Sequence, residues 1–287
     1  MSENAINADE IKQWLDSQSD FSLELKVFSH LLSLDFYAEH GGTYSDPVTN
    51  KPRQFDVRCR LKSKNKIVKL AVECKALSPQ FPLVIQQVPR IKQESYHELF
   101  WAFEPPNNNF HVGGLLDPSK ALRTRSISDL YSVDDFVGKS SSQIGRKKRG
   151  KNDSELYAND SEIYDKWSQA IASSHDLASS SSEDRETMGL EQSLTIIFPV
   201  LVVPNFCLWS VDYDALGNRI SEPTNCDEID FYIDKKLWKK SQFCATYTIS
   251  HLKVATLKGF KQFAEKISSS PDYWRMMFPP THQLVEH

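Results

Sequence analysis

Two segments with the character of β-strands, residues 55–61 and 67–75, constrain the fold more than any other part of the chain. The first alternates apolar and polar side chains, the second is largely apolar, and the polar residues 63–66 lie between them. Two such runs joined by a short polar turn are typical of a β-hairpin. A hairpin restricts which side chains share a face, because successive side chains of a strand point to opposite sides.

A turn at residues 63–66 predicts the register of this hairpin. The pairs on one face are then Val57 with Val72, Cys59 with Leu70, and Leu61 with Val68. All six side chains are apolar, so this register produces one continuous hydrophobic face that can pack on a core.

The opposite face of the same hairpin is polar. Its pairs are Arg60 with Lys69, Arg58 with Ala71, and Asp56 with Glu73. Lys75 shares this face because it lies two residues beyond Glu73. Two carboxylates and an ammonium group are therefore expected to converge at one end of a rigid hairpin.

This cluster has a chemical interpretation and a structural alternative. Like charges directly opposite each other destabilise a strand pair. A divalent cation between Asp56 and Glu73 would offset the repulsion and use both carboxylates as ligands, with the Cys74 carbonyl as a further ligand. Lys75 would then orient a metal-bound water, favour its ionised form, or stabilise the charge of a phosphate in the transition state. In the alternative, Lys75 forms a surface salt bridge with Glu73 or Asp56.

The spacing of these residues resembles a known signature. The chain has Asp56, then sixteen residues, then Glu73-Cys74-Lys75. This spacing is similar to the D…ExK signature of the PD-(D/E)xK, or restriction-endonuclease-like, nuclease superfamily. In that superfamily a helix precedes a three-stranded meander, and a crossover helix leads to a fourth strand. The chain departs from the full signature because Phe55, and not proline, precedes Asp56.

The resemblance implies Mg²⁺-dependent hydrolysis of phosphodiester bonds, with Mn²⁺ as a substitute metal. Asp56 and Glu73 would be the metal ligands, and Lys75 would assist the attacking water. The family also places an acidic residue on the helix that precedes the meander. In this chain that helix is 22–34, and the acidic residue that fits is Glu24. A second ExK triplet begins at Glu24 itself, so the ExK pattern alone is not specific.

The remaining elements fit this order. Apolar spacing predicts helices at 7–15, 22–34, 160–178 and 254–267, and strands near 36, at 194–203, 206–213 and 243–250. The fold class is therefore α/β, with a restriction-endonuclease-like core (a mixed central sheet flanked by helices) and an elaborated β-rich C-terminal region. Residues 1–287 are expected to form one domain. A partly mobile insertion is expected at about 105–153, because this segment is polar and carries a basic run.

Composition limits the partners. The formal charge of -4 argues against a uniformly basic nucleic-acid-binding surface. No apolar run approaches the roughly 20 residues that span a bilayer. The first 20 residues are polar, and the five cysteines form no CxxC pair. These features predict a protein of the reducing cytoplasm that does not enter membranes.

Together these observations predict a Mg²⁺-dependent nuclease that acts on DNA, with RNA as the less favoured substrate. It resembles standalone nucleases of bacterial restriction or anti-phage defence, and a homodimer or partner protein would supply basic surface and a second active site. Arg58 and Arg60 are either phosphate contacts or solvated strand residues. The alternative function is a non-enzymatic scaffold that binds nucleic acid or protein and retains the nuclease fold.

Overall fold

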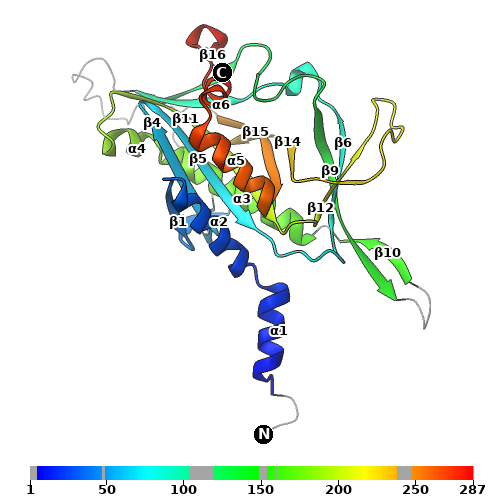
Figure 1. The fold of residues 1–287 in the computed structure, drawn as a ribbon. Helices are drawn as coiled ribbons and strands as arrows, with labels where there is room; N and C mark the ends of the chain where they lie inside the picture. The colour runs from blue at the N-terminus through cyan, green and yellow to red at the C-terminus, as the bar shows by residue number, and fades with distance from the viewer. Residues whose placement is uncertain are drawn as a thin grey trace.

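The computed structural model describes residues 5–46, 49–103, 119–148, 154–159, 161–237 and 247–286. They form a mixed α/β fold in which helices cover a large mixed sheet (Figure 1). This arrangement agrees with the α/β class predicted from the sequence. Within these ranges no helix is both long enough and apolar enough to cross a lipid bilayer.

One half of the sheet contains the predicted hairpin. Its strands, in spatial order, are β1 (Tyr37–His40), β4 (Val57–Ser63), β5 (Lys66–Cys74), β11 (Gln192–Val203), β15 (Tyr247–Thr256) and β14 (Glu228–Leu237). β4 and β5 are antiparallel, whereas β11 runs parallel to both β5 and β15. The edge of β11 that faces away from β5 also pairs, at its start, with β7 (Glu98–Phe103). β7 pairs in turn with β8 (Ser119–Thr124), and β8 pairs with β16 (Leu284–Glu286).

The second half of the sheet is joined to β14 by one parallel pair, Phe231 with Gly138. Its strands are β9 (Phe136–Lys148), β6 (Leu83–Pro89), β12 (Leu208–Asp212), β13 (Thr224–Asn225) and β10 (Ser154–Ala158). Glycine is required at 138, because a Cβ atom there would lie 2.7 Å from Phe231 and 2.8 Å from Ile85. A separate small sheet pairs β2 (Thr43–Ser45) with β3 (Pro52–Gln54).

The register predicted for the hairpin is confirmed. The observed pairs include Val57 with Val72, Cys59 with Leu70 and Leu61 with Val68. β5 is nevertheless more than half of a hairpin, because β11 pairs with it along nearly its whole length. A strand between two neighbours cannot shift its register without breaking both sets of hydrogen bonds, so the positions of the residues at its end are determined.

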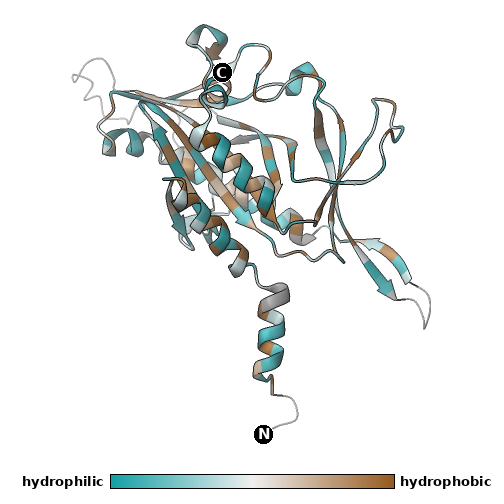
Figure 2. Ribbon diagram, in the orientation of Figure 1, coloured by the Kyte–Doolittle hydropathy of each residue, from teal (hydrophilic) through white to brown (hydrophobic). Residues whose placement is uncertain are grey.

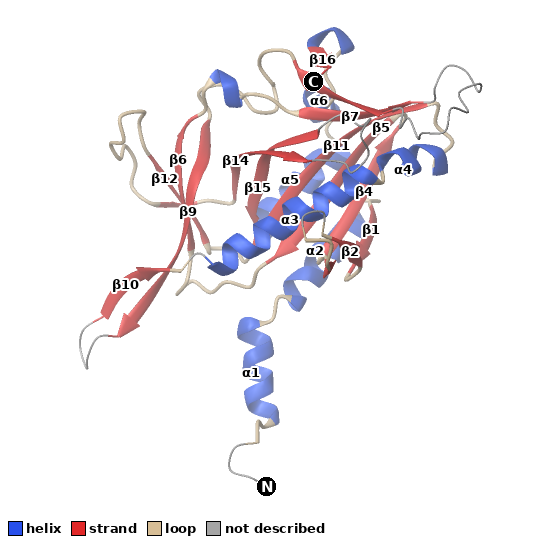
Figure 3. Cartoon of the chain, turned by 180° about the vertical axis from the view of Figure 1, so that it is seen from behind, coloured by secondary structure: helices blue, strands red, loops and turns tan. Residues whose placement is uncertain are grey.

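Helices cover both faces of this half. α2 (Phe21–Ser33) and α5 (Leu257–Ser269) lie on one face, and α3 (Ser161–Ser179) and α4 (Ser181–Thr187) lie on the other (Figures 1 and 3). α1 (Ala8–Gln18) projects from the body, and Asn7 and Glu10 form a capping box at its start. The remaining helices are α6 (Pro271–Met277) and the 3₁₀ turns Lys92–Glu94 and Thr281–Gln283.

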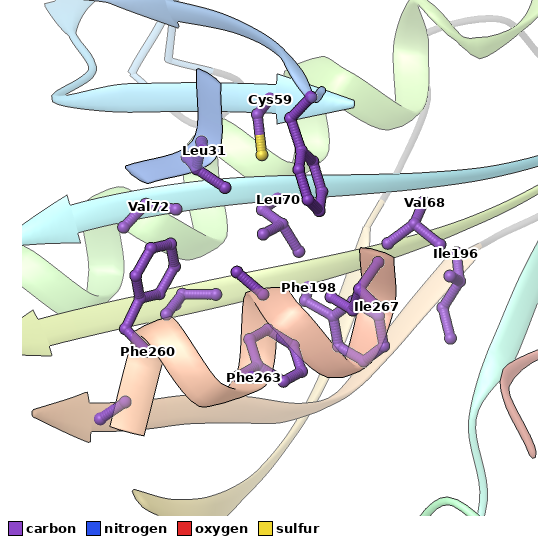
Figure 4. Packing of buried hydrophobic residues seen from close by; sticks show 14 of the residues in the cluster. Leu31, Cys59, Val68, Leu70, Val72, Ile196, Phe198, Phe260, Phe263 and Ile267 are labelled. Atoms are coloured by element: carbon purple, nitrogen blue, oxygen red, sulfur yellow. The ribbon is translucent and has the colours of Figure 1, made fainter. Parts of the chain in front are cut away.

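The main core lies between the sheet and helices α2 and α5. Figure 4 shows side chains of β4, β5 and β11, such as Leu70 and Phe198, packed against Phe260 and Phe263 of α5. Hydrophilic and hydrophobic positions alternate along α5 (Figure 2), as expected for a helix with one buried face. Leu31 of α2 and Leu70 of β5 are fully buried, so the predicted apolar face of the hairpin is the centre of this core.

The polar face of the hairpin is also covered, by α3 and α4. Arg58 donates to Asp176 at 2.7 Å and to Ser173 at 2.9 Å, and Arg60 pairs with Asp184. Arg58 is therefore not a solvated strand residue, whereas phosphate contact stays a prediction for both arginines. Each guanidinium pairs with a carboxylate of a covering helix, and the Arg58 residue is buried.

Lys69 is a deeply buried charge on this face. Its side chain is 1% exposed, pairs with Asp184 and donates to the Leu177 carbonyl at 2.8 Å. Burial lowers the pKa of Lys69, and Asp184 opposes that shift. This ion pair connects the middle of β5 to α4.

Several predicted elements differ from the observed ones. The strand predicted near 36 corresponds to β1, which covers only Tyr37–His40. β14 was not predicted. Within the segment expected to be an insertion, residues 119–148 contain β8 and β9, which the prediction did not anticipate. Residues 104–118 and 149–153 of that segment lie outside the described ranges.

Removal of Asp184 should destabilise the protein strongly. Asp184→Ala leaves Lys69 buried without its carboxylate, and such changes cost about 3–5 kcal/mol. We expect a loss of this size in the free energy of unfolding measured by urea titration.

Two controls distinguish this effect from a general loss of charge. Glu222→Ala removes an exposed carboxylate that pairs with Arg219, and should change stability by less than about 1 kcal/mol. The double variant Lys69→Met/Asp184→Ala should lose less than Asp184→Ala alone, because no unpaired lysine remains. Equal losses in the two Asp184 variants would contradict this account.

Candidate active site

Asp56 and Glu73 meet where the hairpin emerges from the core, as the sequence predicts. Asp56 directly precedes β4, and Glu73 is the penultimate residue of β5. The Asp56 carboxylate accepts a hydrogen bond from the Cys74 main-chain N–H at 2.8 Å. This bond holds the Asp56 carboxylate beside the end of β5, where its charge affects Glu73.

Glu73 is a buried carboxyl group with incomplete hydrogen bonding. Its side chain is 0% exposed, and apart from its interaction with Asp56 neither carboxyl oxygen has a hydrogen-bond partner in the described part of the chain. Burial raises the pKa of Glu73 well above its ordinary value, and Asp56 raises it further, whereas Lys166 lowers it. A buried acid with incomplete hydrogen bonding is unfavourable for folding, which marks this position as a candidate functional site.

A second lysine, which the sequence analysis did not predict, lies at the centre of the cluster. Lys166 extends from α3, and its Nζ lies 3.0 Å from Asp56 Oδ2, 3.5 Å from Asp20 Oδ2 and 3.7 Å from Glu73 Oε2. Burial alone would lower the pKa of Lys166, but the carboxylates of Asp56 and Glu73 outweigh it and raise the pKa.

A signal for Lys166 does exist in the sequence. Ile163, Trp167 and Ala170 form part of the apolar stripe of α3, and Lys166 lies three residues after the first and four before the last. It therefore falls on the same side of the helix. A lysine within an apolar stripe indicates either a snorkelling side chain or a buried carboxylate partner, and the structure shows the second.

α2 adds two further carboxylates. Asp20 lies at the N-cap position of α2 and accepts a hydrogen bond from the Ala76 N–H at 2.5 Å, which ties the helix to the chain just after β5. Glu24 pairs with His40 Nε2 of β1 at 2.9 Å. Burial raises the pKa of Glu24, and Asp56 adds to the shift, so Glu24 belongs to the same electrostatic cluster.

Lys75 and Cys74 follow Glu73 at the end of the strand. The Lys75 N–H donates to the Val202 carbonyl at 2.9 Å, and its side chain is partly exposed. The Cys74 thiol is fully buried in the core on the α2 side, and burial raises its pKa well above the ordinary value. The thiol therefore stays protonated near neutral pH, and the predicted role of Cys74 as a ligand refers to its carbonyl oxygen.

The chemical type of the available ligand atoms fits a divalent cation such as Mg²⁺. Asp56 and Glu73 offer carboxylate oxygens, and the hydrogen bonding of the Glu73 oxygens is incomplete. In the described ranges, no three His, Cys, Asp or Glu side chains are grouped so that they could hold a metal ion. Mg²⁺ is commonly held by one or two carboxylates, with waters and substrate phosphates as its other ligands, so Asp56 and Glu73 are sufficient as protein ligands.

The chain matches no protein-family model, no curated protein and no solved structure. Its chemistry is therefore inferred from the residues of the site and their geometry.

Stability should depend on pH through Glu73. Because its pKa is raised in the folded protein, the folded state holds a proton that the unfolded state releases above about pH 4.5. Without divalent cations, stability should then fall as pH rises from about 4.5 through the folded-state pKa. Glu73→Gln, which removes the titration, should flatten this slope and increase stability at pH 8 by roughly 1–3 kcal/mol.

Unfolding by urea at a series of pH values measures this effect. Glu39→Gln, on the exposed part of β1, is a matched control that should leave the slope unchanged. A Glu73→Gln variant with the same slope as the unmodified protein would show that Glu73 is already ionised throughout this range.

Proposed function

We propose that the protein is a metal-dependent nuclease that hydrolyses phosphodiester bonds in DNA, with Mg²⁺ as the metal and Mn²⁺ as a substitute. The observation that carries the proposal is the meeting of Asp56 and the buried, incompletely bonded Glu73 with Lys166 at the end of β5. Lys75, the residue directly after this strand, completes the spacing that resembles the PD-(D/E)xK signature.

The order of elements around the site supports the proposal. α2 precedes β1, β4 and β5, and α3 leads to β11, which lies parallel to β5. A helix, a three-stranded meander and a crossover to a fourth strand are what the resemblance to restriction-endonuclease-like nucleases implies. The strands β6 to β10 are inserted between β5 and α3.

In this proposal each residue has a separate role. Asp56 and Glu73 hold the cation, which when bound supplies Lewis-acid activation of water and of the phosphate. Lys75 orients the attacking water or stabilises the charge that develops on the phosphate. Glu24, paired with His40, adds negative charge from the first core helix and helps to retain the cation.

A projecting ribbon favours nucleic acid as the substrate. β9 and β10 extend beyond the body on the side where β5 ends, and α1 projects from the same end (Figures 1 and 3). Arg146 and Lys147 on this ribbon are exposed. Leu156 lies opposite Arg146, Glu155 lies opposite Lys147, and the exposed Tyr157 lies opposite the neighbouring Gly145. Cations with aromatic neighbours on a two-stranded ribbon suit contact with a DNA groove and backbone.

One observation favours the alternative function. The Lys166 ammonium already pairs with Asp56 and lies 3.7 Å from Glu73, so the cluster has an internal cation. A cluster with a permanent internal cation would suit a non-enzymatic scaffold that binds nucleic acid or protein. The two functions differ in whether the protein responds to divalent cations at all.

Cleavage of plasmid DNA tests the proposed function. We expect nicking that requires Mg²⁺ or Mn²⁺, and a fall of at least about a hundredfold in Asp56→Asn, Glu73→Gln and Lys75→Met. Lys62→Met removes an exposed lysine of the same hairpin and should cleave normally. Equal activity in all variants, or none with any substrate or metal, would remove the support for a nuclease.

Reversal of charge on the ribbon should weaken DNA binding without changing the cleavage step. In Arg146→Glu/Lys147→Glu we expect the Kd for duplex DNA to rise about tenfold. The slope of log Kd against log salt concentration should fall by about two, because two phosphate contacts are lost. The measurement is fluorescence anisotropy at several salt concentrations. Lys261→Glu, on the exposed side of α5, is the control. An unchanged Kd would exclude the ribbon from the DNA interface.

A further inference from the structure

Lys166 takes the position that a cation bound by the two carboxylates would take. Its Nζ lies 3.0 Å from Asp56 Oδ2 and 3.7 Å from Glu73 Oε2. The side chain is only 18% exposed, and its third carboxylate neighbour, Asp20, lies 3.5 Å away. The ammonium is thus surrounded by carboxylates from α2, from the start of β4 and from the end of β5.

The contact with Asp56 Oδ2 excludes a second cation from the same oxygen. A Mg²⁺ or Mn²⁺ ion binds carboxylate oxygens at about 2.0–2.2 Å and repels a nearby ammonium group. Asp56 Oδ2 already accepts hydrogen bonds from the Cys74 N–H and from Lys166. The metal can use this oxygen only if the lysine withdraws from it.

We infer that Lys166 competes with the divalent cation for this site. Without metal, Lys166 holds the carboxylates of Asp56 and Glu73 together, and it must withdraw before the metal binds. The inference rests on the proposed metal-binding role of these two carboxylates. It assigns Lys166 a positioning role that controls the occupancy of the site.

The structure provides a partner for the withdrawn lysine. Asp20 is held by the Ala76 N–H through Oδ1, so its Oδ2 remains available to the Lys166 ammonium. Four-carbon lysine side chains change rotamer easily, and the ammonium need only turn from Asp56 toward Asp20. A substrate phosphate near the metal would attract the withdrawn ammonium as well, so metal and DNA are expected to bind more tightly together than separately.

Calorimetric titration with Mn²⁺, without DNA, tests the inference. Lys166→Met should bind Mn²⁺ about tenfold more tightly than the unmodified protein, because no ammonium has to be displaced. Without metal, the same variant should melt at a lower temperature, and saturating Mn²⁺ should raise its Tm by more than it raises that of the unmodified protein.

Matched variants separate direct competition from a change of local charge. Lys75→Met removes one positive charge from the same strand end and should tighten Mn²⁺ binding less than Lys166→Met does. Lys166→Arg keeps the charge and should restore weak Mn²⁺ binding. If Lys166→Met fails to fold without metal, Lys166→Gln, which keeps a polar group at this position, provides the same comparison.

The outcomes for the two proposals are distinguishable. If Lys166→Met and the unmodified protein bind Mn²⁺ equally, and Asp56→Asn abolishes binding in both backgrounds, the competition is refuted while the metal site stands. If no variant binds Mn²⁺, the competition and the metal-dependent function both fail. Equal tightening in Lys166→Met and Lys75→Met would also overturn the inference, because it would show a general effect of charge.

Discussion

The structure depends on the burial of β5 between β4 and the parallel strand β11. Pairing on both edges and helices on both faces remove this strand from water along nearly its whole length. Apolar side chains on one face form the core with α2 and α5. The polar side chains of the other face, Lys69 and Glu73, are buried as well, so charges from other elements must neutralise them.

The two polar positions of β5 are neutralised to different extents. Lys69 pairs with Asp184, and a carbonyl and two hydroxyl groups also lie within hydrogen-bond distance of its ammonium. Glu73 has the Lys166 ammonium at 3.7 Å, and apart from its interaction with Asp56 neither of its oxygens has a hydrogen bond in the described ranges. The first arrangement is a complete structural ion pair. The second retains unused ligand capacity, which is typical of a functional site.

Local pattern was sufficient for elements that bury one face in the core. Helices α2, α3 and α5 and strand β11 lie close to where apolar spacing predicts them, because this spacing directly reflects the face or faces that each element buries. The pattern failed for β9, which contains two glycines and many polar residues, and for β14, which carries three acidic residues. Hydrogen bonding to neighbouring strands determines these two elements, and the sequence of a strand does not reveal which strands lie beside it.

For the site, the sequence by itself determined that Asp56 and Glu73 face each other. The register of a short hairpin follows from its turn and from the alternation of apolar side chains, both local properties. Only the tertiary structure decided that α3 and α4 cover this polar face, which buries Arg58 and pairs it with Asp176. It also decided that Lys166, 110 positions from Asp56, reaches the carboxylates. That contact depends on how a crossover helix packs on the sheet, which no local pattern encodes.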